Sequence, residues 1–187
     1  MRIIAGSVRG TRLQVADVPG LRPTGDRQRE TLFNVIREVL PDAEVLDLFA
    51  GTGALGLEAL SRGGREATFV ESSRKAVAML HLNIAKCGFE SASKVIQSEA
   101  IKGLRRIAEH GQTFDLVFAD PPWAADSTQA WLDSLAAVTR AEALLCLERE
   151  SGTEVGQHAA WEPRRVLGIG ETTFHLLTRI VPSHADC

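Results

Sequence analysis

The chain has 187 residues, of which 44% are hydrophobic and 24% charged, and its formal net charge is -3. This length allows one domain with a full core and a short appendage, and the composition is ordinary for a soluble globular protein. No apolar run is long enough to span a membrane, and the first residues lack the apolar region of a secretory signal, so we expect a cytoplasmic protein.

The cysteines and histidines argue against a disulfide-stabilised protein and against a metal-binding protein. Cys87, Cys146 and Cys187 are odd in number and far apart, which argues against a disulfide framework and against a Cys-x-x-Cys metal pair. The five histidines show no His-Glu-x-x-His or other ligand spacing. We therefore predict no metal site.

The first 40 residues are more basic than the rest. They hold seven arginines and four acids, an excess of three positive charges on an otherwise acidic chain. Glycines and prolines in residues 1–25 favour a hairpin and loop after a short Ile3-Ile4 strand. We expect residues 1–40 to form an extension that finishes with a helix capped by Asp26 and ended by Pro41. A local positive field would suit an acidic partner, and merely solvated charges are the alternative.

Strand and helix patterns alternate in residues 41–182, which we take as the main domain. We predict strands at 45–49, 67–71, 94–97, 114–119 and 143–147, and helices at 53–62, 74–87, 100–110 and 126–139. Strict alternation implies a parallel sheet with helices on both faces, hence a three-layered α/β fold. Two β-rich runs, 165–169 and 173–180, flank a Gly-Glu turn and predict a closing antiparallel hairpin. Residues 183–187 should be a frayed tail.

A glycine-rich loop, Gly51-x-Gly53-x-x-Gly56, follows the first predicted strand. Bare backbone there can approach a ligand closely, and the next helix supplies free N–H groups. Glu71 ends the second predicted strand, where an acid can accept hydrogen bonds from both ribose hydroxyls. The pattern also fits NAD, and a structural tight turn is a further alternative.

Asp47 favours S-adenosylmethionine as the cofactor, because a carboxylate just before the turn suits a ligand with a cationic amino-acid end. Nothing downstream offers an acid and base for hydride transfer. Glu99 can accept a hydrogen bond from the adenine amine, although an exposed acid in a helix's first turn is equally ordinary. The predicted cofactor residues are Asp47, Phe49, Ala50, Gly51, Thr52, Gly53, Gly56, Glu71, Ser72, Glu99, Ala100 and Asp120.

The segment Asp120-Pro121-Pro122-Trp123 follows the fourth predicted strand, at a switch point of the sheet where ligands bind. Prolines lack N–H groups, so their neighbourhood is rich in carbonyl acceptors. Asp120 and a backbone carbonyl can hold both hydrogens of an exocyclic amine, which aligns the nitrogen for methyl transfer and stabilises the developing positive charge. Trp123 can stack on an extruded base, or else be a core tryptophan. We predict all four residues as catalytic.

The chain resembles the bacterial 16S rRNA guanine-N2 methyltransferases of the RsmD family over nearly its full length. The matching segments are Arg2–Gly6, Gly10-x-Arg12-Leu13, residues 21–34, Val45–Arg62, Phe69–Glu71 and Asp120–Pro122. The N-terminal block is specific to this family, whereas the glycine loop and Asp-Pro-Pro also occur in adenine-N6 DNA enzymes. Trp123 replaces the more usual Tyr or Phe, and Glu99 stands where the wider superfamily often has Asp.

The resemblance implies a class I S-adenosylmethionine-dependent methyltransferase fold, Rossmann-like, with a seven-stranded, mostly parallel sheet. It also implies methylation of one guanine in 16S rRNA, within an assembling 30S particle. The sequence leaves the oligomeric state open, and we favour a monomer. Arg9, Arg12, Arg22 and Arg27 would then contact RNA phosphates. The alternatives are a methyltransferase for DNA adenine or protein glutamine, and a non-catalytic RNA-binding assembly factor.

Overall fold

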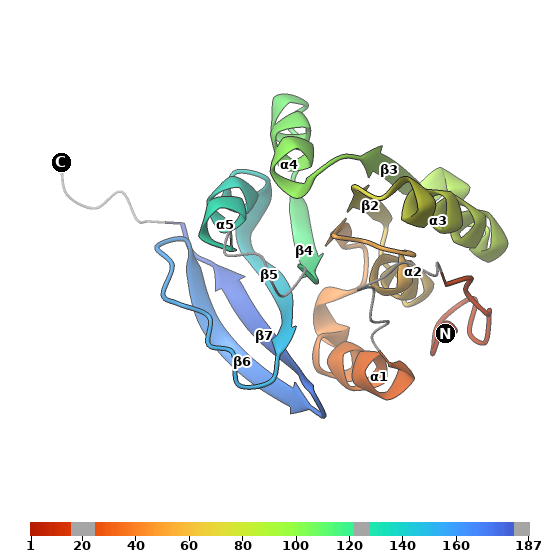
Figure 1. Ribbon diagram of the computed structural model, residues 1–187, viewed down its shortest axis with the longest axis horizontal. Helices are drawn as coiled ribbons and strands as arrows, with labels where there is room; N and C mark the ends of the chain where they lie inside the picture. The colour runs from red at the N-terminus through yellow and green to blue at the C-terminus, as the bar shows by residue number, and fades with distance from the viewer. Residues whose placement is uncertain (16–24, 122–127, 182–187) are drawn as a thin grey trace.

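The computed structural model describes residues 1–15, 25–121 and 128–181, and it is built around one seven-stranded sheet (Figure 1). The strand order is β3-β2-β1-β4-β5-β7-β6. The strands are β1 (Glu44–Leu48), β2 (Glu66–Glu71), β3 (Ser93–Gln97), β4 (Phe114–Ala119), β5 (Thr139–Glu150), β6 (Trp161–Ile169) and β7 (Thr172–Arg179). The α-helices in these ranges are α1 (Asp26–Val35), α2 (Ala54–Ser61), α3 (Arg74–Cys87), α4 (Ala100–Glu109) and α5 (Thr128–Ala136).

The first five strands run parallel, and the sheet ends with an antiparallel hairpin, as the sequence predicted. β1 pairs in parallel with β2 and β4, β2 pairs with β3, and β4 pairs with β5. The last strand, β7, inserts antiparallel between β5 and β6, so β6 forms the edge of the sheet. β5 is longer than the predicted 143–147 at both ends: Thr139 already pairs with Phe114 of β4, and the pairing with β7 continues to Glu150.

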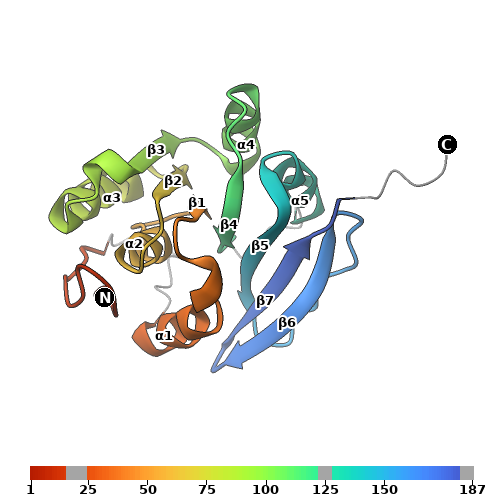
Figure 2. The same cartoon turned by 180° about the vertical axis from the view of Figure 1, so that it is seen from behind.

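The helices cover both faces of the sheet. Leu57 of α2 and Leu80 of α3 belong to one buried cluster, together with Phe33 of α1. Leu104 of α4 and Trp131 of α5 belong to a second cluster on the opposite face. Figure 2 shows α1 and α2 on one side of the strands and α4 and α5 on the other. Within the described residues, no helix combines the length and apolar character needed to cross a membrane.

Local capping explains where α3 begins and ends. Helix α3 has the predicted bounds, because the Ser73 hydroxyl accepts the Ala76 N–H and Gly88 ends the helix in the left-handed region, at φ 71°. Helix α1 differs from its prediction. Gly25 rather than Asp26 precedes the first turn, and the helix stops at Val35 before a short 3-10 turn, Arg37–Val39.

The N-terminal hairpin docks on α2 through one buried carboxylate. Glu58 is fully buried and accepts the N–H groups of Ile4 and Ala5 at 2.7 and 3.0 Å. It also pairs with Arg62 at 2.7 Å and with the buried Arg29 of α1 at 3.5 Å. The hairpin, α1 and α2 are therefore held together by one network of buried charge.

Candidate active site

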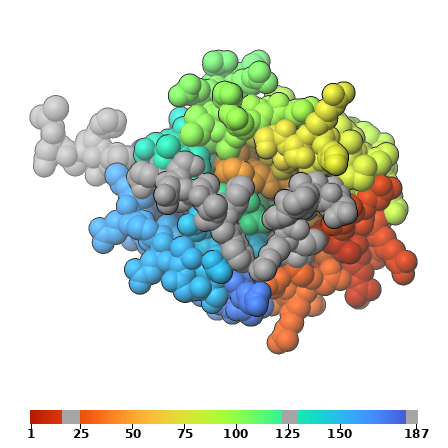
Figure 3. Space-filling view, viewed as in Figure 1, coloured from red at the N-terminus to blue at the C-terminus, as the bar shows by residue number. Residues whose placement is uncertain are grey.

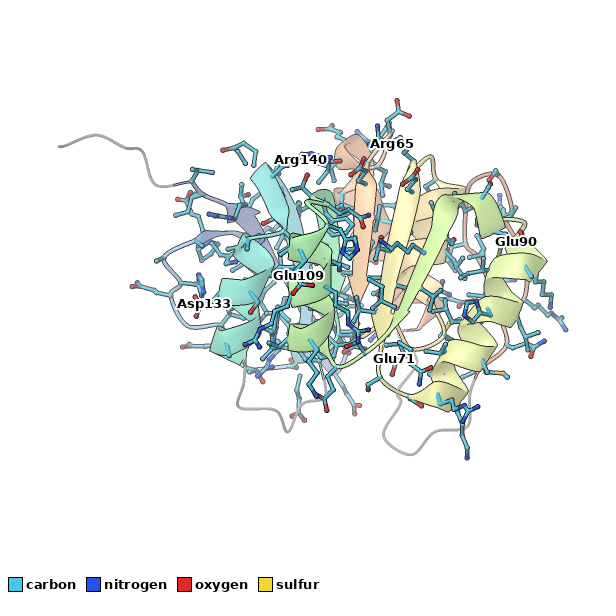
Figure 4. The ribbon with its side chains drawn as sticks, turned by 90° about the horizontal axis from the view of Figure 1, so that it is seen from above. Arg65, Glu71, Glu90, Glu109, Asp133 and Arg140 are labelled. Atoms are coloured by element: carbon cyan, nitrogen blue, oxygen red, sulfur yellow. The ribbon has the colours of Figure 1, made fainter. Side chains whose placement is uncertain are left out.

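Carboxylates gather at the edge of the sheet where the parallel strands end. The register pairs Leu48 of β1 with Ala119 of β4, and Ala119 with Leu147 of β5. One step beyond these paired residues come Asp120 and Glu148, and Glu71 ends β2 at the same level. Figure 4 shows Glu71 at this end of the strands, opposite Arg65 and Arg140.

The glycine loop joins β1 to α2, as predicted, and its backbone is tied to two of these acids. The Gly51 N–H donates to Glu71 Oε2 at 2.8 Å, and the Gly56 N–H donates to Asp47 Oδ2 at 2.8 Å. Gly53 has φ +81°, and a Cβ there would lie 2.3 Å from Leu80 Cδ1. Only glycine therefore fits at this turn.

The environment of Asp47 disfavours its charge. Its side chain is 3% exposed, and burial raises its pKa to about 8. Burial is the largest cause of this raised pKa; the hydrogen bond from Gly56 acts against it, and the nearby charge of Glu71 acts with it. Asp47 therefore gains most from a ligand that brings positive charge.

Asp120 directly follows β4 and is partly buried. Burial raises its pKa to about 8, and the charges of Glu148 and Asp47 act in the same direction. Pro121 beside it is buried. The predicted Pro122 and Trp123 lie outside the described residues.

Acids at the amino end of the parallel strands have basic partners that the acids at the carboxyl end lack among the described residues. At the amino end, Glu44 pairs with Arg65 and with Arg140, and Asp115 pairs with Arg140 at 2.7 Å. At the carboxyl end, no ion pair in the described ranges joins Asp47, Glu71 or Asp120 to a basic side chain.

An acceptor set of this kind fits the groups of S-adenosylmethionine. An ammonium can neutralise Asp47, and ribose hydroxyls can donate to Glu71, whose carboxylate is fixed by N–H groups of Gly51 and Ser73. The same set does not suit a pyrophosphate, because its negative charges would be repelled by the buried carboxylates. In the parts of the chain that the structure describes, no group of three or more His, Cys, Asp or Glu could hold a metal ion.

The remaining predicted cofactor residues surround this edge. Phe49 has φ 67° and packs edge-on against Trp131, with ring centroids 5.9 Å apart. The Ala50 N–H donates to the Val70 carbonyl at 3.0 Å, which fixes the start of the loop, and the Thr52 carbonyl accepts from Asn83.

Two predicted cofactor residues, Ser72 and the predicted adenine contact Glu99, are less enclosed. Ser72 is exposed, and so is Glu99, which precedes α4 and Ala100 and pairs with Lys102 at 2.9 Å. The Ser98 N–H donates to the Glu71 carbonyl at 2.9 Å, so this turn stays beside the predicted ribose acceptor.

Sequence reasoning missed two buried polar residues, Glu148 on the far side of Asp120 from the loop and Asn83 in contact with the loop. Glu148 lies near the end of β5 and is 5% exposed. Asn83 of α3 is fully buried, and its amide links the Thr52 carbonyl to the backbone of Gln14. A usable signal existed for Glu148, because it is a lone acid after the apolar run 143–147, just as Asp47 is a lone acid in 45–49.

The predicted RNA-contacting arginines are exposed where the structure describes them. Arg9 and Arg12 lie on the hairpin and Arg27 on the first turn of α1, whereas Arg22 lies outside the described residues. Figure 3 shows the hairpin in red and α1 in orange next to each other on one flank. A cavity of about 350 Å³ lies between them, and Arg2, Arg9 and Arg62 contribute to its lining.

The strand order, the glycine loop and the acids at the carboxyl edge define a class I S-adenosylmethionine-dependent methyltransferase. A family model named Conserved hypothetical protein 95 matches residues 1–178. The chain belongs to this family, which is the RsmD family.

Relatives in the family match over the whole chain. Ribosomal RNA small subunit methyltransferase D of Escherichia coli K12 is 39% identical over 189 residues, covering 100% of this chain and 93% of the relative. The solved structure of yhhF of Escherichia coli has a TM-score of 0.82 and 37% identity, covering 96% and 97% of the two chains. A hypothetical protein of Thermus thermophilus has a TM-score of 0.80 and 31% identity, covering 94% and 98%.

Proposed function

We propose that the protein transfers a methyl group from S-adenosylmethionine to the exocyclic N2 amine of a guanine in 16S rRNA. The observation that carries this proposal is the position of Asp120. This acid follows β4 directly beside β1, whose glycine loop and Asp47 supply the acceptors for the cofactor. The relative from Escherichia coli K12, by its name, methylates small-subunit ribosomal RNA.

The chemistry needs a positioned amine and a place for its proton. Bound S-adenosylmethionine supplies an electrophilic methyl group on a sulfonium, which becomes a neutral thioether after transfer. Asp120 and a carbonyl of the following prolines accept the two amine hydrogens and hold the nitrogen in line with that methyl group. As the new C–N bond forms, the nitrogen gains positive charge and releases one proton, which the Asp120 carboxylate accepts. Trp123 would stack on the extruded base.

The N-terminal extension, residues 1–40, supplies the RNA contacts in this proposal. Exposed Arg9, Arg12 and Arg27, with Arg22, neutralise phosphates and set the orientation of the RNA without reading its sequence. An assembling 30S particle in the cytoplasm is the substrate, and a monomer suffices because every assigned group comes from one chain. The acidic main domain, residues 41–182, carries the cofactor.

The test is methylation of 30S particles from cells that lack this protein. Particles are incubated with labelled S-adenosylmethionine and the protein, and the label is mapped by mass spectrometry of rRNA fragments. We expect label on the N2 of one guanine in 16S rRNA. Label only on DNA or protein would instead support the related amine methyltransferases, and binding to particles without label would support a non-catalytic assembly factor.

A further inference from the structure

We propose that Glu148 reads the methylated base as guanine, by accepting a hydrogen bond from its N1–H beside the reacting N2 amine. This inference rests on the proposed function and deepens it, because it assigns a specificity-determining residue to the substrate side of the same site.

The sheet brings Glu148 next to Asp120. Ala119 of β4 pairs with Leu147 of β5, so the next residue of each strand lies one strand spacing from the other, about 5 Å apart at the backbone. Side chains alternate along a strand, so both acids continue the face that carries Phe118 and Cys146. Glu148 and Asp120 therefore share one side of the sheet.

Glu148 also lies on the far side of Asp120 from the cofactor loop. The strand order places β4 between β1, which carries the loop, and β5, which carries Glu148. On its other flank Glu148 pairs with Phe174 of β7, which is fully buried in the core of the same face. A base whose amine is held at Asp120 then extends toward Glu148, away from the loop.

The chemistry of guanine matches two neighbouring carboxylates. Its Watson–Crick edge presents N1–H and the N2 amine side by side as donors, and enzymes that extrude a base read this edge. Adenine and 2-aminopurine present an N1 lone pair instead, which a buried carboxylate repels. A site built to accept an N–H discriminates strongly against an analogue that lacks it.

The electrostatics of the ligand-free site agree with this assignment. Glu148 is 5% exposed, and its charge is one of the causes that raise the pKa of Asp120. Two acids this close and this buried disfavour full ionisation of both. A planar base that offers adjacent N–H donors to both carboxylates offsets that repulsion, and a base with an acceptor at N1 adds to it.

The test combines a change of the target base with a substitution at Glu148. Particles are reconstituted from 16S rRNA carrying guanine or 2-aminopurine at the mapped position, since 2-aminopurine keeps the N2 amine but has an acceptor at N1. The kcat/KM ratio, guanine over 2-aminopurine, is measured for the native protein, for Glu148→Gln and for Glu150→Gln. Glu150 is an exposed acid on the same strand and serves as the matched control.

We expect the native protein and Glu150→Gln to prefer guanine, and Glu148→Gln to lower the ratio by about 10-fold or more, because a glutamine amide can donate to the N1 lone pair. An unchanged ratio in Glu148→Gln, or equal use of both bases by the native protein, would overturn the proposal. So would loss of S-adenosylmethionine binding by Glu148→Gln in calorimetry, which would assign Glu148 to the cofactor. If the native protein methylates no guanine at all, the proposed function itself fails.

Discussion

The Gly56 N–H donates to Asp47 Oδ2 at 2.8 Å, and this hydrogen bond joins β1 to the first turn of α2. Asp47 is almost fully buried, and burial raises its pKa from 3.8 to about 8. The ionised carboxylate therefore destabilises the ligand-free fold, and a cationic ligand relieves that cost. A site can thus be selected for affinity at the expense of stability.

The first prediction concerns Asp47→Asn. Because the folded pKa lies above the unfolded one, this acid's contribution to stability is fully present below about pH 4 and is lost as the pH rises toward 8. The variant removes that loss. The free energy of unfolding of Asp47→Asn should equal that of the native protein at about pH 4 and exceed it by a few kcal/mol at about pH 8.

Urea unfolding at several pH values measures this difference, and calorimetry measures cofactor affinity. The dissociation constant for S-adenosylmethionine should rise by about 10-fold or more, because the ammonium loses a charged acceptor. A variant that is destabilised equally at every pH would contradict the role of the buried charge.

The second prediction concerns the pH dependence of methyl transfer. Asp120 can take the amine proton only when its carboxylate is ionised, and its pKa is raised to about 8, chiefly by burial. The kcat/KM of the native protein should therefore rise with pH up to about 8 and level off above it. Asp120→Asn should lower kcat by about 100-fold or more and abolish this rise.

Asp115→Asn is the control, because Asp115 lies at the opposite end of the same strand and pairs with Arg140. It should keep both the rate and the pH profile. If the kcat/KM of the native protein is constant between about pH 6 and pH 9, the Asp120 carboxylate does not accept the proton.

The third prediction concerns the buried network that docks the extension. Glu58→Gln leaves the fully buried Arg29 with a weaker set of partners and removes the charge that accepts the Ile4 and Ala5 N–H groups. The cost should be about 3 kcal/mol, because a buried cation is left partly uncompensated. Urea unfolding checks this, and Glu38→Gln at an exposed position should change stability by less than about 0.5 kcal/mol.

Local signals in the sequence predicted most of the fold. The helix pattern at 74–87 predicted the bounds of α3, and the position of the glycine loop followed from its place after an apolar strand. These are interactions between residues near one another in the chain. The Asp-Pro-Pro segment was placed at the end of β4 for the same reason.

Features made by distant residues were not predictable in this way. Glu58 is 53 residues from Ala5, and the local sequence of α2 does not indicate that this carboxylate accepts hydrogen bonds from backbone N–H groups of the hairpin. The insertion of β7 between β5 and β6 depends on pairing energies between whole strands. Glu148 gained its significance only when the register set it beside Asp120. The predicted helix does not continue to Pro41: α1 ends at Val35, and the chain goes on as the 3-10 turn Arg37–Val39.

The fourth prediction concerns the salt dependence of RNA binding. The exposed Arg9, Arg12 and Arg27 lie on the hairpin and the first turn of α1, which the Glu58 network holds together. If each neutralises a phosphate, the triple alanine variant should raise the RNA dissociation constant and reduce the slope of log affinity against log salt by about 2. Affinity for S-adenosylmethionine should not change, because these arginines lie away from the acids that bind it.

Arg105→Ala, at an exposed site on α4 across the sheet, is the matched control. Filter binding of 16S rRNA fragments between 50 and 300 mM salt, roughly the range in which such slopes are resolved, decides the matter. A triple variant with the native slope would mean that RNA docks on a different surface.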